Sequence, residues 1–135
     1  MNKLLIDTNV FIYDIDKSSK YHNLANEILN SDKELYTTTK NISEYFAVLT
    51  KLELNYEKIW SYYLDIKRNV NILYPSKKSL LLFEELLEKY RPKGNRIYDI
   101  EIVSVMASYK IPLLGTFNLK DFTHIDEIDI YKPNL

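Results

Sequence analysis

The sequence predicts an α/β fold, a three-layer sandwich in which a parallel five-stranded sheet is flanked by helices. The clearest sign is the apolar run Leu4-Leu5-Ile6, which has no polar alternation and therefore suits a strand buried on both faces. Four more strand-length runs follow, and segments with helical spacing of apolar residues lie between them. Strands that alternate with helices indicate a parallel sheet covered by helices on both faces.

The predicted elements cover most of the chain. Apolar residues at helical spacing, such as Leu24, Ala25 and Ile28, mark the helices, and Pro75 closes the third strand. No linker or repeat interrupts the pattern, so residues 1–135 are expected to form one domain. The predicted strands are residues 3–6, 34–37, 70–73, 112–115 and 128–131. The predicted helices start after Asp7 and cover residues 21–29, 42–54, 56–67, 80–90 and 97–109.

The composition excludes several kinds of functional site. The chain has no cysteine and only two histidines, His22 and His124, which excludes zinc–thiolate sites and argues against a His-rich one. The 18 Lys plus Arg and 19 Asp plus Glu give a formal net charge of −1, so nucleic-acid binding would need a local basic patch. No apolar run approaches the roughly 20 residues of a membrane span. A cytoplasmic protein without membrane contact is therefore expected.

Four acidic residues stand out by their positions at element boundaries. Asp7 follows the first strand, Glu44 and Asp99 lie near the starts of helices, and Asp121 follows the fourth strand. Each has a purely structural alternative, because acids cap helices, stabilise their first turns and favour turns. Parallel strands point the same way, however, so all four side chains can converge on one rim of the sheet.

Clustered carboxylates favour a divalent cation. The charges repel one another and raise one another's pKa, and a cation relieves that repulsion. Mg²⁺ and Mn²⁺ prefer oxygen ligands, so with no Cys and little His the chain suits either ion better than zinc.

Four segments that contain these acids resemble, in order, the motifs of a known family. They are Asp-Thr-Asn-Val-Phe at residues 7–11, Asn-Ile-Ser-Glu at 41–44, Tyr-Asp-Ile-Glu-Ile-Val at 98–103 and Thr-Phe-Asn-Leu-Lys-Asp-Phe at 116–122. Together they resemble the motifs of PIN-domain ribonucleases, and most closely those of the small VapC-type toxins of toxin–antitoxin pairs. The resemblance covers essentially the whole chain.

The resemblance implies a PIN-like fold and an Mg²⁺- or Mn²⁺-dependent endoribonuclease with a quartet of acids at its centre. Carried over by position, the quartet is Asp7, Glu44, Asp99 and Asp121, although Asn118 stands where many relatives have an Asp. Asp7 and Asp99 would bind metal directly, and Glu44 would do so directly or through water. Attack by water would leave a 5′-phosphate and a 3′-hydroxyl.

Other residues around the quartet are candidates for holding RNA. Thr116 resembles the family's hydroxyl beside the site and, with Asn118, would contact water or a phosphate oxygen. Arg96 and Lys93 precede Asp99, and Lys120 adjoins Asp121, so these cations could hold backbone phosphates. Ordinary solvated surface charge is the alternative for each of them.

The resemblance also implies partners, namely an RNA substrate, a second copy in a homodimer and a cognate antitoxin that covers the site. A surface for such contacts is expected in the helices between Tyr21 and Leu64, which carry many aromatic residues that one small domain cannot easily bury. Completion of the core is the alternative. The aromatic residues include Tyr45, Phe46, Tyr56, Trp60, Tyr62 and Tyr63.

Alternative functions remain open from the sequence. One is a solitary PIN-domain nuclease that processes RNA, and another is a catalytically inactive module that binds RNA or protein. A haloacid-dehalogenase-like phosphatase would use Asp7 as a nucleophile, but it usually needs a second Asp where Asn9 stands. A metal-independent nuclease would use His22 or His124.

Overall fold

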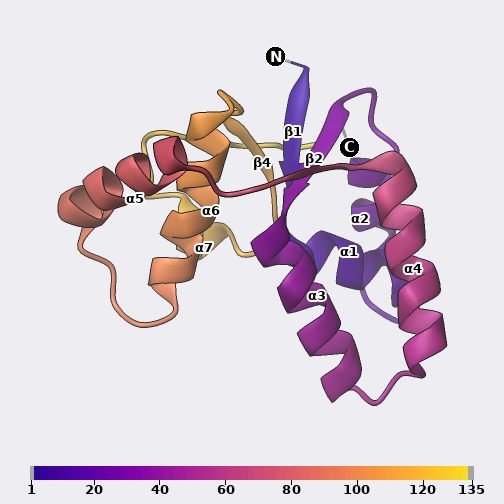
Figure 1. The fold of residues 1–135 in the computed structure, drawn as a ribbon. Coiled ribbons are helices and arrows are strands. Elements are labelled where there is room, and N and C mark those ends of the chain that lie inside the picture. Colours follow the sequence, from indigo (N-terminus) through magenta and orange to yellow (C-terminus); the bar gives the residue numbers. More distant parts are fainter. Residues whose placement is uncertain (1, 134–135) are drawn as a thin grey trace.

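The computed structural model describes residues 2–133, in which strands and helices alternate around one sheet (Figure 1). The strands are β1 (Lys3–Ile6), β2 (Glu34–Thr38), β3 (Asn71–Leu73), β4 (Leu113–Gly115) and β5 (Asp129–Ile130). The helices are α1 (Thr8–Ile15), α2 (His22–Leu29), α3 (Thr39–Lys51), α4 (Tyr56–Asn69), α5 (Lys77–Tyr90), α6 (Arg96–Ser108) and α7 (Leu119–Phe122).

The five strands form one parallel sheet in the order β3-β2-β1-β4-β5, as the sequence predicts. The chain builds outwards from the central β1 through β2 to β3, and then crosses to β4 on the other side of β1. The carboxyl ends of β1 and β4 therefore border the point where the direction of building reverses, which is where ligands bind in open α/β sheets.

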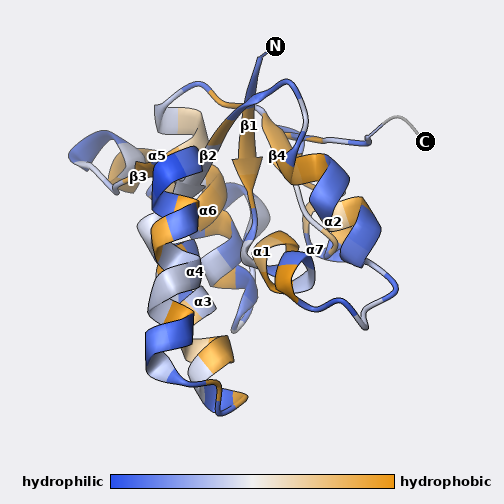
Figure 2. Ribbon diagram, turned by 90° about the vertical axis from the view of Figure 1, so that its right-hand side faces the viewer, coloured by the Kyte–Doolittle hydropathy of each residue, from blue (hydrophilic) through white to orange (hydrophobic). Residues whose placement is uncertain are grey.

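Each face of the sheet has its own hydrophobic core. Leu5 points into the core shared with α5 and α6, and Leu4 and Ile6 point into the core shared with α1 to α4, because neighbouring residues of a strand face opposite sides. Figure 1 shows α5, α6 and α7 on one side of the strands and α1 to α4 on the other. Figure 2 shows hydrophobic colouring along most of β1, as burial on both faces requires.

Several predicted elements differ from the structure. Helix α5 begins at Lys77, three residues before its predicted start, where Ser76 and Ser79 form a capping box. Helix α3 begins at Thr39, three residues before the predicted start, because Thr38 and Asn41 form a reciprocal capping box there. The four-residue helix α7 was not predicted, since a single turn is too short to show a periodic pattern.

The aromatic residues of α3 and α4 divide between core and surface. Tyr45 is only 1% exposed, whereas Tyr56 and Trp60 are 59% and 50% exposed. Phe46 packs against both of these rings and against Tyr63, so the four form one aromatic cluster on the outer side of the two helices. No helix within residues 2–133 has the length and apolar character needed to cross a membrane.

Candidate active site

Asp7 lies where β1 ends and α1 begins. Its backbone N–H donates to the carbonyl oxygen of Gly115 at 2.9 Å, which extends the contact between β1 and β4 by one residue. Its carboxylate accepts the backbone N–H of Thr8 at 2.8 Å and so caps α1. Asp7 is only 5% exposed. Its carboxylate is therefore both the cap of α1 and the candidate functional group at this rim.

Two side chains from distant segments hold this carboxylate in place. Asn41 donates its Nδ2 proton to Asp7 Oδ1 at 3.0 Å, and Thr116 donates its hydroxyl proton to Asp7 Oδ2 at 2.7 Å. Asn41 is fully buried, and its Oδ1 accepts from Thr38 in the capping box of α3. One amide therefore fixes both the start of α3 and the orientation of Asp7.

Asn9 completes the set of hydrogen bonds around Asp7. Its Nδ2 lies 3.4 Å from Asp7 Oδ2 and 3.3 Å from Thr116 Oγ1, and its Oδ1 accepts the backbone N–H of Phe117 at 3.1 Å. Neither Asn9 nor Asn41 was predicted from the sequence to belong to the site. The available signal was that Asn9 follows Asp7 by two residues and Asn41 precedes Glu44 by three.

Burial and neighbouring charges raise the pKa of Asp7 and of Asp99. Burial is the largest cause of the raised pKa of Asp7, opposed by the hydrogen bonds from Thr116, Thr8 and Asn41 and reinforced by Glu44. Burial also leads the causes that raise the pKa of Asp99 to about 6, followed by the charges of Asp121, Asp7 and Glu44, with Arg96 opposing them. The other three carboxylates are therefore within electrostatic reach of Asp99.

Glu44 is held by a cation from its own helix. Lys40, one turn earlier on α3, forms an ion pair with Glu44, and its Nζ lies 4.4 Å from the centre of the Tyr98 ring. The Lys40 side chain is only 23% exposed. Lys40 on α3 thus contacts Tyr98 on α6.

Asp121 is held in a similar way. Arg96 Nη2 lies 3.1 Å from Asp121 Oδ1, so the first residue of α6 pairs with α7. Asn118 is exposed beside α7, and its backbone N–H donates to Thr116 Oγ1 at 3.1 Å. Asp121 and Asn118 therefore approach the rim from different sides, Asp121 next to Asp99 and Asn118 next to Asp7.

The carboxylates are close but do not form a ready-made metal cage. Among residues 2–133, no three Asp, Glu or His side chains are arranged to share one ion. Lys40 pairs with Glu44, and Arg96 pairs with Asp121. That Asp7, Glu44 and Asp99 can reach a common ion stays a prediction.

Comparison with known families shows what kind of domain carries this geometry. The PIN domain family matches residues 4–128, a span that includes all four carboxylates. The chain belongs to the PIN-domain family. This confirms the family that the four sequence segments suggested, and PIN domains are in general a nuclease family.

Solved structures share the fold of this PIN domain along almost its whole length. A chain of the VapBC2 complex of Rickettsia felis, bound to promoter DNA, is 22% identical with a TM-score of 0.74, covering 96% of this chain and 97% of that one. A chain of VapBC-1 from nontypeable Haemophilus influenzae is 25% identical with a TM-score of 0.70, covering 96% of each.

A third similar structure is VapC20 of Mycobacterium tuberculosis, a toxin that cleaves the sarcin–ricin loop. It is 13% identical with a TM-score of 0.73, covering 90% of this chain and 95% of that one. No protein of curated function matches the sequence.

A cavity of about 280 Å³ opens beside Asp7 in this PIN domain. Its walls combine the acids Asp7 and Glu44 with Asn9, Asn118 and the apolar side chains of Ile12 and Val48. Thr116 is not among the lining residues, since its hydroxyl is buried against Asp7. The cavity lies between α1 and α3 and borders Asp7.

The remaining candidates lie around the acidic rim of the PIN domain or away from it. Lys93 and Lys120 are exposed, in the loop before α6 and on α7 respectively. His22 Nδ1 lies 2.9 Å from the carbonyl oxygen of Tyr13, and the His124 ring packs edge-on against Tyr90. Neither histidine is among the groups that shift the pKa of Asp7 or Asp99.

Proposed function

We propose that this PIN domain is an endoribonuclease that hydrolyses RNA phosphodiester bonds with Mg²⁺ or Mn²⁺, and that it is the toxin of a VapBC-type pair. The observation that carries the proposal is the clustering of four carboxylates at the carboxyl edge of the sheet, where burial first and then the charges of its neighbours raise the pKa of Asp99 to about 6. The repulsion between the clustered charges has no structural benefit, and a bound cation relieves it.

The donor chemistry of the rim fits a hard divalent ion. All candidate ligands are carboxylate oxygens, and the described part of the chain brings no thiolate or imidazole to them. Asp7 and Asp99 would bind the ion directly. Glu44 would bind it directly or through a water molecule after its ion pair with Lys40 breaks. When bound, the ion supplies charge neutralisation and an activated water for attack on a phosphate.

The protein side chains supply orientation and phosphate binding. Asn9, Asn41 and Thr116 keep the Asp7 carboxylate in one orientation, so no reorganisation is needed when substrate arrives. Asp121 or Asn118 would orient the attacking water. Because Thr116 gives its proton to Asp7, we assign it to positioning rather than to phosphate contact.

Exposed cations around the rim suit the phosphate backbone of RNA. Lys93, Arg96 and Lys120 lie in the loop before α6, at its start and on α7, so they flank Asp99 and Asp121. Each phosphate contact releases counterions, so RNA affinity should fall as salt rises.

The decisive experiment is a cleavage assay with purified protein and structured RNA. Cleavage should require Mg²⁺ or Mn²⁺, stop with EDTA, and leave a 5′-phosphate and a 3′-hydroxyl. A 2′,3′-cyclic phosphate formed in EDTA would overturn the proposal.

The VapBC complexes of similar fold support an antitoxin partner. A homodimer and a cytoplasmic location are further parts of the proposal. The exposed cluster of Phe46, Tyr56, Trp60 and Tyr63 offers apolar area for contact between copies. Sedimentation should show a dimer that Trp60→Glu dissociates. Growth arrest on expression should be relieved by the product of an adjacent small reading frame, whereas arrest that no such product relieves would favour a solitary nuclease.

A further inference from the structure

Tyr98 presents an exposed aromatic ring next to the acids of the rim. It is the third residue of α6 and is 49% exposed, and the partly buried acid Asp99 follows it directly. Among residues 2–133, no other aromatic ring packs against it, in contrast to the exposed ring of Trp60, which belongs to a cluster. The fold therefore leaves much of this ring free for a ligand.

Lys40 fixes the position of the Tyr98 ring relative to the acids. The Lys40 ammonium group forms an ion pair with Glu44 and lies over the ring, 4.4 Å from its centre. One cation therefore lies between a carboxylate of the rim and the Tyr98 ring. The ring is 49% exposed with Lys40 in this place, so Lys40 positions the ring without covering it.

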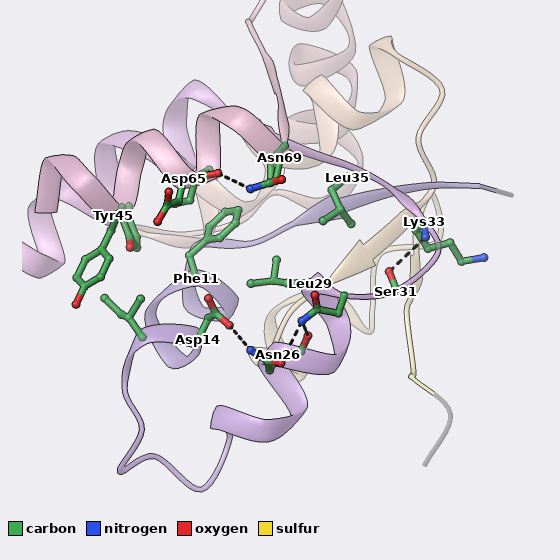
Figure 3. Close-up of a pocket in the computed structure, with 15 residues that line it drawn as sticks. Phe11, Asp14, Asn26, Leu29, Ser31, Lys33, Leu35, Tyr45, Asp65 and Asn69 are labelled. Carbon is green, nitrogen blue, oxygen red and sulfur yellow. Dashed lines mark hydrogen bonds between the residues drawn. The ribbon is translucent and has the colours of Figure 1, made fainter. Parts of the chain in front are cut away.

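The ring lies on the open surface of the protein. Tyr98 does not line the cavity beside Asp7. Nor does it line the separate cavity of about 470 Å³ between α1, α2 and α4, which Figure 3 shows. An extended chain can therefore pass over the Tyr98 ring without entering an enclosed pocket.

The surroundings of the ring are charged. Arg96, two residues before Tyr98, pairs with Asp121 at 3.1 Å, and Lys93 is exposed in the loop before α6. An aromatic ring among cations is the combination with which proteins bind single-stranded nucleic acid, because the cations hold phosphates while a base stacks on the ring. The cores of protein–protein interfaces are depleted of charged residues, so these neighbours favour a base over a protein side chain.

We propose that Tyr98 stacks on an unpaired base of the RNA, next to the phosphate that the acidic rim cleaves. This inference rests on the proposed ribonuclease function and adds a substrate-binding residue to it. A base inside a duplex is covered on both faces by its neighbours, so only an unpaired base offers a free face to the ring. Tyr98 thus selects single-stranded or looped RNA, and it favours purines because their larger rings stack more strongly.

Binding measured apart from cleavage tests this inference. The Asp7→Asn variant in Mg²⁺ serves as a background with slowed cleavage, and fluorescence anisotropy gives its affinity for a short labelled single-stranded RNA and for the duplex of the same sequence. In this background, Tyr98→Ala should weaken single-strand binding roughly fivefold to a hundredfold, the range for one lost stacking contact, and leave duplex binding unchanged. Tyr98→Phe keeps the ring and should bind as the background does.

Tyr109→Ala is the matched control. Tyr109 is 41% exposed and caps the opposite end of the same helix, away from the acids that follow Tyr98. Its replacement should leave the affinity for both RNAs unchanged. Circular dichroism of each variant establishes that the fold is intact.

A spectroscopic signature separates stacking from a merely structural role of Tyr98. Trp60 is the only tryptophan of the chain, so Tyr98→Trp places a second reporter at the proposed contact. Its fluorescence should be quenched by single-stranded RNA and not by the same strand with abasic residues. The Tyr98→Phe variant reports Trp60 alone, and its fluorescence should not change.

Two results would overturn the inference. One is equal single-strand affinity of Tyr98→Ala and Tyr109→Ala, and the other is fluorescence of Tyr98→Trp that RNA does not quench. In both cases metal-dependent cleavage by the unchanged protein would still support the proposed function. Absence of metal-dependent cleavage would overturn the proposed function, and this inference with it.

Discussion

The two sides of the acidic rim are built differently. On the side of β1 and α3, neutral donors hold Asp7, namely Asn41, Thr116, Asn9 and the backbone of Thr8. On the side of α6 and α7, no described hydrogen bond holds the Asp99 side chain, and Asp121 is held only by the charge of Arg96.

One side of the rim is therefore held rigidly, and the other side carries the electrostatic repulsion. Neutral donors stabilise the charged form of Asp7 and fix its orientation without cancelling its charge. On the other side the charges are unsatisfied or paired with exposed cations, so that side can rearrange when a cation or phosphate arrives. A rigid ligand next to an adaptable one suits an ion that must bind and leave.

The largest expected effect is on the rigid side. Asp7→Asn keeps the shape of the side chain but removes the charge. Loss of an outer partner of a metal ligand already costs roughly 10–100-fold, so this change should lower the cleavage rate by about a hundredfold or more, as measured by single-turnover kinetics. Asp129→Asn alters an exposed acid on β5 and serves as the control. Undiminished cleavage by Asp7→Asn would place the chemistry elsewhere.

Asn41→Ala tests whether the rigid side is also structural. The change removes the Nδ2 donor to Asp7 and Thr8 and the Oδ1 acceptor of Thr38, which is the reciprocal half of the α3 capping box. Lost buried hydrogen bonds and a weakened cap together should lower the free energy of unfolding by about 2–4 kcal/mol. Urea denaturation measures this, with exposed Asn23→Ala on α2 as the matched control. A loss no greater than that of the control would show that the amide is dispensable.

Asp99 should make the metal-free protein less stable as pH rises. Its pKa is raised from 3.8 to about 6 on folding, so between these values the folded protein holds a proton that the unfolded chain has lost. The contribution of Asp99 to stability therefore falls as pH rises from about 4 to 6 and stays reduced above that. Asp99→Asn should raise the melting temperature in EDTA at pH 7.5, and raise it less at pH 5. A lower melting temperature at pH 7.5 would contradict the assigned repulsion.

The smallest expected effect is on metal affinity, when Lys40, which forms an ion pair with Glu44, is replaced. Lys40→Gln frees Glu44 for an incoming ion, and because partly exposed ion pairs are weak, the dissociation constant for Mn²⁺ should fall only about twofold to fivefold. Calorimetry without RNA measures this. Lys120→Gln, which changes a cation with no described acidic partner, should not tighten binding. Weaker Mn²⁺ binding in Lys40→Gln would mean that Lys40 supports the site instead of competing for it.

The sequence predicts the sheet, most helices and the positions of the acids, because strand burial and helical spacing are local patterns. It does not predict that Asn41 holds Asp7, since a hydrogen bond between residues 34 positions apart depends on how β1 and α3 meet. Nor does it predict that Lys40 reaches Tyr98 across two helices. The family resemblance named which acids to consider, but the state of each acid depends on neighbours that only the folded chain brings together.

The double role of Asn41 has an evolutionary consequence. Because one amide caps α3 and orients Asp7, a lineage cannot discard this half of the rim without also weakening its fold. Asp99 has no comparable structural role, and its replacement should remove charge repulsion with the neighbouring acids from the metal-free protein. Descendants that lose catalysis but keep binding their partners are therefore expected to change first at Asp99 and Asp121, and to retain Asp7 with its amides as a relic.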